Sequence, residues 1–364
     1  MTPGGCLPPL AIEDLDHVLS HTRDLWEEAR GARFFITGGT GFFGIWLLET
    51  FARANDVLGL QMRAVVLTRN PASFSIKSPH LAGRADITLL EGDIRTFHPP
   101  PGAFDYVIHA ATEASARLND ENPREMFDSI LSGTSYVLSY AKAAGVRKFL
   151  FTSSGAVYGR QPPHITHIPE TYLGAPDPLQ PGSAYGLGKL AAEYLCVLEG
   201  RDANFEIKIA RGFAFVGPHL PLDNHFAIGN FLRSVMNGIS PRLSGDGTPR
   251  RSYLYASDMA IALWSILFQG PAGRAYNVGS KHDLSIAELA KTVCIALSRA
   301  DLAPIHPYHA LDNPSPSRYV PCVEKAVAEL NICQHVSLED AIRKTALYYS
   351  KPLLRSSGTF TAHA

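Results

Sequence analysis

Acidic and basic residues are few in this chain, and their charges nearly cancel. Lys and Arg number 33 and Asp and Glu number 34, which leaves a formal net charge of −1 over 364 residues. A chain with this balance lacks the basic field that binds nucleic acid and the polybasic patch that binds anionic membranes. We therefore expect no nucleic-acid partner and no membrane partner.

Cysteine is scarce as well, and its five residues are scattered. They are Cys6, Cys196, Cys294, Cys322 and Cys333, and no Cys-x-x-Cys pair occurs among them. An odd number of isolated thiols is typical of a reducing compartment and argues against a disulfide framework. The first residues lack a basic start and a long apolar run, so we expect no signal peptide and no membrane span. These absences predict a cytoplasmic protein.

Clusters of metal ligands are also missing, although the chain has 14 histidines. The closest pair, His164 and His167, lies in a proline-rich stretch without cysteine or acidic neighbours. A structural or catalytic metal site needs more ligands than this pair supplies. We predict no metal.

The chain is rich in apolar residues, at 46%, and they form short runs separated by helical patterns. The expected strands span 33–37, 63–68, 87–91, 105–110, 148–153 and 206–210, and the later ones are separated by helical stretches near 123–144 and 184–199. Continuous apolar strands that alternate with helices are typical of a parallel sheet covered on both faces. We predict an α/β fold with a doubly wound parallel sheet.

Three glycines at three-residue spacing connect the first expected strand to a helical run. They are Gly38, Gly41 and Gly44 in "ITGGTGFFG". A dinucleotide requires a tight turn, a close backbone approach to its pyrophosphate and close helix–strand packing at this point. A simple glycine-rich turn has the same composition, but a strand before it and a helix after it are the context that dinucleotide binding needs. We predict a dinucleotide site here.

The end of the second strand bears on which nicotinamide cofactor binds. An acid at this point would accept hydrogen bonds from the ribose hydroxyls of NAD. The chain reads "VVLTRN" instead, and Arg69 could pair with the 2′-phosphate of NADP or could be an ordinary solvated loop residue. The expected cofactor is NADP or NAD, with NADP favoured.

Further residues are expected to line the cofactor. Asp93 is the expected partner of the adenine amino group, and Ile94 is expected to lie against the adenine ring. The predicted cofactor-binding residues are Gly38, Thr40, Gly41, Phe42, Phe43, Gly44, Thr68, Arg69, Asn70, Asp93, Ile94, Ala110, Ala111, Thr112, Ser153, Tyr185, Lys189 and Phe213.

A tyrosine and a lysine four positions apart suggest proton transfer. Tyr185 and Lys189 in "SAYGLGKLAAE" would share one helix face, and Ser154 ends the preceding strand. A free tyrosine has a pKa near 10, but a neighbouring ammonium and a nicotinamide charge favour the phenolate. Such pairs also occur on helices without any catalytic role. Behind a Ser-Ser strand end and a glycine-rich turn, we predict that Ser154, Tyr185 and Lys189 are catalytic.

Together these motifs resemble the extended short-chain dehydrogenases/reductases of the NAD-dependent epimerase/dehydratase family, which act on nucleotide sugars. The similarity covers roughly residues 32–350 and rests on "TGGTGFFG", "GDI", "HAAT", "AAGVRKFLFTSSGAVYG", "SAYGLGK", "ARGFAFVGP", "GDGTPRRSYLYASD" and "YNVGS". The resemblance implies a Rossmann domain and a smaller mixed α/β substrate lobe at the C-terminal end. It also implies a homodimer built from two helices per subunit, here 123–144 and 184–199.

The domain organisation follows from the resemblance and from changes in the pattern. An amphipathic helix is expected in the N-terminal extension, because apolar residues recur at helical spacing over 14–30. The predicted units are the extension at 1–31, the Rossmann domain at 32–212 with 253–280 returning to it, the substrate lobe at 213–252 and 281–350, and a loose tail at 351–364.

The resemblance also implies a nucleotide-diphosphate sugar as the substrate, whose diphosphate arginines would bind. The family's diphosphate arginine corresponds to Arg251 in "GDGTPRRSY", and Arg318 is a second candidate. Ala214 stands where the family often has an asparagine that binds the substrate. The predicted substrate-binding residues are Ser115, Ser154, Gly155, Ala214, Asn230, Phe231, Arg251 and Arg318.

The reaction type depends on the stretch "TSSGAVYG", residues 152–159. In the sugar dehydratases and decarboxylases that this chain resembles, acids follow the catalytic hydroxyl, but here Gly155 and Ala156 occupy those positions. Hydride transfer at sugar C4 with tyrosine as acid and base is therefore favoured, as in a 4-epimerase or a 4-ketoreductase. The alternatives are a decarboxylase-like or dehydratase-like enzyme in which Glu113 supplies an acid, and an NADP-binding scaffold without catalysis.

Overall fold

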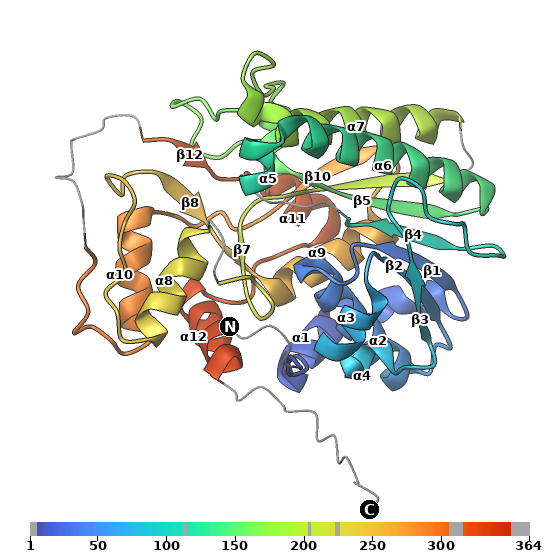
Figure 1. The fold of residues 1–364 in the computed structure, drawn as a ribbon, viewed down its shortest axis with the longest axis horizontal. Helices are drawn as coiled ribbons and strands as arrows, with labels where there is room; N and C mark the ends of the chain where they lie inside the picture. The colour runs from blue at the N-terminus through green and yellow to red at the C-terminus, as the bar shows by residue number, and fades with distance from the viewer. Residues whose placement is uncertain (1–5, 112–115, 203–204, 223–225, 306–315, 351–364) are drawn as a thin grey trace, which may run out of the picture.

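A seven-stranded parallel sheet forms the middle of the protein (Figure 1). The structure, a computed structural model, describes residues 6–111, 116–202, 205–222, 226–305 and 316–350. The strands are β1 Arg33–Thr37, β2 Arg63–Thr68, β3 Ile87–Glu91, β4 Tyr106–His109, β5 Lys148–Ser154, β6 Glu206–Gly212 and β10 Arg274–Val278. Their order is β10-β6-β5-β4-β1-β2-β3, and every neighbouring pair is parallel. The predicted α/β fold with a doubly wound parallel sheet is confirmed.

The strand order reverses at β1, which pairs with β2 on one side and with β4 on the other. In open parallel sheets, ligands bind beyond the carboxyl ends of the strands at such a switch point. The end of β1, where the three spaced glycines lie, is therefore the place where this fold offers a ligand site.

Helices cover both faces of the sheet and give each face its own core. One face carries α1 Ile12–Thr22, α2 Phe42–Leu58 and α9 Ala256–Gln269; the other carries α6 Pro123–Ala143 and α7 Ala184–Asp202 (Figure 1). Adjacent residues of β1 show the division, because alternate side chains of a strand point to opposite faces. Phe34 packs on Tyr106 with ring centroids 4.6 Å apart, whereas Phe35 packs on Tyr140 at 4.7 Å on the other face.

The N-terminal extension forms a shorter α-helix than its apolar pattern predicts. α1 ends at Thr22, and the 3-10 helix η1 Arg23–Ala29 continues from it. Trp26 in η1 is fully buried, with its ring centroid 4.5 Å from that of Trp264. Residues 6–11 are also packed: Leu10 is buried, and the Leu7 amide donates to the carbonyl of Lys77 at 2.8 Å.

Short helices complete the connections around the main sheet. They are α3 Pro71–Lys77, α4 Pro79–Ala82, α5 Ala116–Glu121 and the 3-10 turns η2 Gly155–Tyr158 and η3 Pro181–Ser183. Asn70 caps α3, because its side-chain oxygen accepts from the Ser73 amide at 2.8 Å. This cap fixes the chain just after the end of β2.

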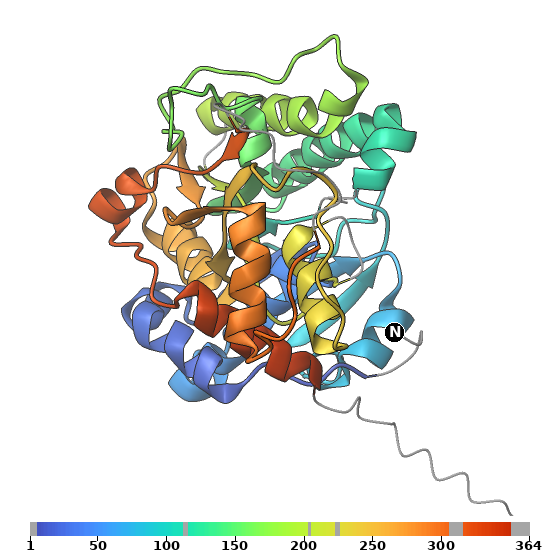
Figure 2. The ribbon, with the colours of Figure 1, turned by 90° about the vertical axis from the view of Figure 1, so that its left-hand side faces the viewer.

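A smaller mixed part lies beside the sheet (Figure 2). Its helices are α8 Ala227–Met236, α10 Ile286–Ala296 and α12 Leu338–Ser350; its strands are β7 Phe215–Val216, β8 Arg250–Ser252, β9 Leu254–Tyr255, β11 Asp283–Ser285 and β12 Arg318–Tyr319. α11 Glu324–Leu330 packs instead against β10 of the main sheet. β11, β8 and β12 form one small sheet, and β7 and β9 form another. Between the segments of this part, the chain returns to the main sheet as β10, which lies beside β6.

Other expectations can be compared with the described ranges. There, no helix combines the length and apolarity that a bilayer span requires. All five cysteines are free thiols. The expected loose tail, 351–364, lies outside the described residues.

Candidate active site

The three glycines form a narrow turn between β1 and α2. Gly38 has φ +71°, and a Cβ built on it would lie 2.4 Å from the carbonyl carbon of Ala110. A Cβ on Gly44 would lie 2.2 Å from the carbonyl oxygen of Gly38, whereas one on Gly41 would meet that oxygen only at 3.5 Å. Two glycines thus serve the turn and the helix–strand contact, and the third leaves the backbone accessible. This arrangement fits the pyrophosphate of a dinucleotide.

A hollow of about 190 Å³ lies next to this turn, at the end of β2. Its lining residues are Thr40, Thr68, Arg69, Asn70, Ser73, Phe74 and Lys77. Two of these are cationic, several carry hydroxyl or amide groups, and no acid is among them. The hollow therefore has the charge that a phosphate requires.

The side chains expected around the adenine are already in contact with protein groups. Asp93 accepts from Arg95 at 2.8 Å, and this contact, with help from Arg69, holds the Asp93 pKa below its ordinary value. Ile94 lies against α6, because a Cβ on Gly133 would be 2.9 Å from Ile94 Cγ2. Phe42 and Phe43 lie in the first turn of α2, partly buried against the core.

Ser154 ends β5 and starts the 3-10 turn that follows. Its Oγ accepts from the Ala156 amide at 3.2 Å, which fixes the hydroxyl at the carboxyl edge of the sheet. Tyr185, near the start of α7, lies close enough to Ser154 for the serine to lower the Tyr185 pKa, which partly offsets the burial that raises it. The structure therefore brings the expected serine and tyrosine together.

Lys189 lies one turn after Tyr185 and is buried at 2% exposure. Its ammonium donates to the carbonyl oxygen of Thr152 at 2.7 Å and lies 4.7 Å from the ring centroid of Phe151. Burial lowers the Lys189 pKa to about 7, and Glu193 acts in the opposite direction. Burial raises the Tyr185 pKa and Ser154 lowers it, so the expected lowering of the tyrosine pKa by this lysine is not found in the protein alone.

Tyr319 on β12 was not found from the sequence, although it directly follows Arg318. Its hydroxyl oxygen lies 3.3 Å from Ser154 Oγ, and its ring lies 4.7 Å from that of Phe213. Burial raises its pKa above the usual range. Only its position after a predicted substrate arginine could have indicated it.

Phe213 also occupies the space next to Gly155. A Cβ built on Gly155 would lie 2.7 Å from the Phe213 ring. An acidic side chain at this position would have to displace the ring. The Phe213 ring thus leaves no space for an acidic side chain at position 155.

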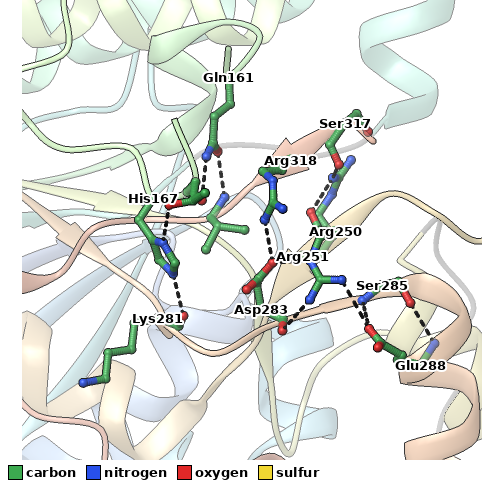
Figure 3. Close-up of polar contacts among 12 residues, drawn as sticks. Gln161, His167, Arg250, Arg251, Lys281, Asp283, Ser285, Glu288, Ser317 and Arg318 are labelled. Atoms are coloured by element: carbon green, nitrogen blue, oxygen red, sulfur yellow. Dashed lines mark hydrogen bonds and ion pairs between the residues drawn. The ribbon is translucent and has the colours of Figure 1, made fainter. Parts of the chain in front are cut away.

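The two predicted substrate arginines have different surroundings (Figure 3). Arg318 donates to Asp283 at 2.8 Å, and Arg250 pairs with the same carboxylate oxygen. Arg251 donates to the carbonyl oxygens of Arg250 at 2.8 Å and Ser317 at 3.4 Å. Burial lowers the Arg251 pKa, and within the described ranges no carboxylate forms a salt bridge with it. Arg251 is therefore the better placed of the two to take an anion.

The remaining predicted residues lie in several environments. Thr68, Ala110 and Ala111 lie where their strands end, and Ser153 donates to Glu193 at 2.5 Å. Ala214 and Asn230 are half-buried, whereas the Phe231 ring is buried in the larger core, where it is committed to packing. Thr112, Glu113 and Ser115 lie outside the described residues, and in the described part no three potential ligands gather as a metal site.

The sheet order, the glycine turn and the Ser-Tyr-Lys arrangement define a Rossmann-type α/β protein. The profile of the NAD dependent epimerase/dehydratase family matches residues 34–279. This chain therefore belongs to that family, as the motifs predicted.

Known proteins of three activities are similar to the chain. UDP-glucuronic acid decarboxylase 1 of Arabidopsis thaliana is 29% identical over 310 residues, covering 85% of this chain and 68% of that protein. UDP-glucose 4-epimerase of Thermotoga maritima, solved with UDP-glucose, has a TM-score of 0.71 at 22% identity, covering 87% of this chain and 98% of that one. The dTDP-glucose 4,6-dehydratase of Streptomyces venezuelae, solved with NAD, has a TM-score of 0.71 at 22% identity, covering 87% and 96%.

Proposed function

We propose that this protein is an NAD(P)-dependent nucleotide-sugar enzyme that exchanges a hydride at sugar C4, as a 4-epimerase or a 4-ketoreductase. The observation that carries this proposal is the placing of Ser154 next to Tyr185, with Lys189 buried and bound to the Thr152 carbonyl one turn further along α7. These groups lie at the carboxyl edge of the sheet, where the glycine turn also opens. Family membership and the UDP- and dTDP-sugar activities of the similar proteins support it.

The proposed roles follow from the chemistry of the three side chains. A bound nicotinamide supplies hydride exchange with the C4 carbon. Tyr185 takes or returns the proton of the C4 hydroxyl, and Ser154 orients the same oxygen by a hydrogen bond. Lys189, when charged, favours the phenolate form of Tyr185. Because burial raises the Tyr185 pKa, this cationic help is needed at neutral pH.

The absence of acids next to Ser154 favours simple alcohol–ketone exchange over loss of water. Gly155 is closed off by the Phe213 ring, and Ala156 carries no acid. The space near Ser154 is lined instead by the hydroxyl of Tyr319. The hydroxyls of Ser154 and Tyr319 can bind a sugar oxygen, but they cannot replace a carboxylate as a base at neutral pH.

Decarboxylation of a UDP-hexuronate is the second candidate. The Arabidopsis decarboxylase that matches 85% of the chain favours it. It would begin with the same oxidation at C4, which makes the C6 carboxylate a β-keto acid group. It would then need no base to remove a proton from carbon.

The proposed cofactor is NADP in preference to NAD. Arg69 and Lys77 line the hollow at the end of β2, and no acid lies among its lining residues. A ribose 2′-phosphate would bring two negative charges to this hollow, and the cations would match them. An NAD ribose would find hydroxyl and amide partners, but no carboxylate.

Arg251 is the proposed binder of the substrate diphosphate. Its carbonyl partners satisfy some of its donors and leave its positive charge unbalanced. Arg318 would bind the same diphosphate in exchange for part of its contact with Asp283. Asn230 remains a proposed nucleotide contact on α8.

A homodimer through α6 and α7 is the proposed assembly. The two helices pack side by side on one face of the sheet (Figure 1). On α7, Tyr194, Val197 and Leu198 are exposed apolar residues, at 64%, 39% and 38%. A second copy would bury them.

Mass spectrometry of the product distinguishes the candidate reactions. The protein is incubated with NAD or NADP and with UDP-glucose, UDP-N-acetylglucosamine, UDP-glucuronate and dTDP-glucose. A product of unchanged mass that separates from the substrate by chromatography indicates epimerisation, and oxidation of added NADPH in the presence of a 4-keto sugar nucleotide indicates ketoreduction. A product that is lighter by CO₂ would establish decarboxylation, and one that is lighter by water would establish dehydration. Cofactor binding without turnover of any sugar nucleotide would instead favour the alternative of an NADP-binding scaffold without catalysis.

A further inference from the structure

A buried carboxylate lies directly behind the Tyr185–Lys189 pair. Glu193 is one helical turn after Lys189 on α7 and is only 5% exposed. Its Oε1 accepts from Ser153 Oγ at 2.5 Å and from Arg211 Nε at 3.0 Å, and its Oε2 accepts from Arg211 Nη2 at 2.6 Å. One acid thus connects the catalytic helix to the ends of β5 and β6.

The charges around Lys189 do not cancel without this acid. Lys189 is a buried cation and Arg211 a partly buried one, and Glu193 is the carboxylate that interacts with both. The other titratable groups facing Lys189 are His109 on β4 and Cys196 on α7. Burial, with help from Lys189, lowers the His109 pKa to about 3, so this ring is neutral at pH 7; burial also raises the Cys196 pKa and keeps its thiol neutral. Of these described groups, Glu193 is the one that carries a negative charge.

Arg211 cannot easily move away if Glu193 is removed. Its Nη1 donates to the hydroxyl of Tyr158 at 2.8 Å, and that hydroxyl donates to Asn277 Oδ1 at 2.8 Å. Asn277 in turn donates to the carbonyl oxygens of Ile168 and Cys322 at 2.9 and 3.0 Å. This chain of hydrogen bonds keeps the guanidinium near the catalytic helix.

We propose that Glu193 is a positioning residue for proton transfer. Its carboxylate balances the charge of Arg211, so that Lys189 stays cationic, and it also holds the end of β5 against α7. The proposal rests on the proposed role of Tyr185 and Lys189, and it goes beyond that role by naming the group that sets the charge of the lysine. It assigns Ser153 a second task as well. Because Ser153 precedes Ser154 on β5, the hydrogen bond from its hydroxyl to Glu193 fixes the strand end next to Ser154.

The first test measures Lys189 directly and requires no substrate. Lysine carrying ¹³C at Cε is incorporated, and the Lys189 signal is assigned as the one lost in Lys189→Met. The pH titration of this signal is compared in the wild type, Glu193→Gln and Arg211→Met. Removing the carboxylate should lower the Lys189 pKa by about one unit or more, and removing the guanidinium should raise it by a similar amount.

Glu199→Gln is the matched control, because Glu199 lies on the same helix, half-buried, with its carboxylate 3.7 Å from the Lys142 ammonium. It should leave the Lys189 titration as in the wild type. If Glu193→Gln lowers only the melting temperature and leaves the titration unchanged, Glu193 is merely structural and the proposal is wrong. If that variant does not fold, Arg211→Met decides, since an unchanged Lys189 pKa there overturns the charge balance.

The second test uses turnover of the substrate that product analysis identifies. In Glu193→Gln, a less charged Lys189 favours the Tyr185 phenolate less. Therefore kcat at pH 7 should fall about tenfold, and the acid limb of the pH profile, which reports Tyr185, should move up by about one pH unit. The double variant Glu193→Gln/Arg211→Met should move the limb back. A uniform loss at all pH values, without a shift, would contradict the proposal. Because the NMR titration needs no substrate, it can succeed even where the proposed reaction fails.

Discussion

Tyr319 and Ser154 are 165 positions apart in the chain, yet their hydroxyl oxygens lie 3.3 Å apart. β12 is a two-residue strand of the smaller part, and Ser154 is the last residue of a strand in the main sheet. A side chain from the smaller part therefore reaches the residue proposed to orient the reacting oxygen. In the proposed function, substrate binding and chemistry would meet at this contact.

Replacing Tyr319 with phenylalanine should reduce turnover moderately. The ring and its packing on Phe213 are kept, and only the hydroxyl partner of Ser154 is lost. A neutral hydrogen bond contributes about 0.5–1.5 kcal/mol, so kcat should fall roughly 3- to 10-fold. Steady-state kinetics check this, with Tyr136→Phe as the control because that hydroxyl donates to the carbonyl of Phe97. Equal effects of the two substitutions would remove Tyr319 from the site.

Tyr185→Phe should have a much larger effect. General acid–base help is worth roughly a hundredfold or more, so kcat should fall by at least that factor. Cofactor affinity should stay near the wild-type value, because only the hydroxyl is removed. Tyr194→Phe on the exposed side of the same helix should change neither quantity. Full turnover by Tyr185→Phe would show that the assigned acid–base group is wrong.

Arg69→Ala should weaken NADP binding more than NAD binding. A charged contact with the 2′-phosphate is worth about 1.5–3 kcal/mol, and NAD lacks that phosphate. Lys77→Ala should have the same direction of effect, because Lys77 lines the same hollow. Fluorescence titration of each variant with both cofactors measures the difference, with the exposed Lys281→Ala as a control. Equal losses for the two cofactors would mean that Arg69 does not contact the phosphate.

Reversing the charge of Arg251 should abolish sugar-nucleotide binding and spare the cofactor. Arg251→Glu replaces an unbalanced cation by an anion that repels the diphosphate. Calorimetry with UDP, dTDP, GDP and CDP should show no binding, whereas NADP affinity should be retained. Arg124→Glu, on an exposed residue of α6, should keep the wild-type affinity for the preferred nucleotide. Unchanged affinity of Arg251→Glu for every nucleotide would exclude Arg251 from the site.

Acid should destabilise the fold partly through His109. Burial, followed by the charge of Lys189, lowers its pKa to about 3, while Thr37 and Thr134 hold the ring at 2.8 and 3.0 Å. The unfolded chain binds a proton below its ordinary pKa near 6.5, so stability is present above that pH and is lost as pH falls from 6.5 toward 3. At pH 5.5 this amounts to about 1.4 kcal/mol.

Urea unfolding of His109→Gln checks this dependence. Between pH 6.5 and 5.5, its free energy of unfolding should fall by about 1 kcal/mol less than that of the wild type. His98→Gln, at an exposed histidine, should keep the wild-type slope. A wild-type slope in His109→Gln would mean that the ring takes up its proton in the folded state.

The sequence predicts the strands of the main sheet closely, and it predicts the helix of the extension less well. Buried parallel strands are continuous apolar runs, so 33–37, 63–68 and 87–91 have the predicted bounds. The α-helix expected to continue to residue 30 ends instead at Thr22, whose hydroxyl accepts from Trp26 Nε1 at 3.0 Å. Trp26 turns inward toward Trp264, which is a partner that no local pattern reveals.

In the candidate site, too, the sequence does not reveal residues whose partners are distant in the chain. Gly38, Ser154, Tyr185 and Lys189 belong to short motifs, and the spacing within these motifs, together with the expected strands and helices around them, indicates them. Tyr319 and Glu193 have no motif, because their importance comes from neighbours that are brought to them by the fold. The different surroundings of Arg251 and Arg318 likewise depend on where Asp283 lies.

The burial of Trp26 against Trp264 has a consequence for synthesis on the ribosome. Trp26 is made well before its partner Trp264, and the edge of β6 stays open until β10 appears. A nascent chain that stops before residue 264 therefore exposes both an indole surface and an unpaired strand edge, which are the features that chaperones bind and that aggregate. The first and last thirds of this molecule are made far apart in time, and they become stable only together.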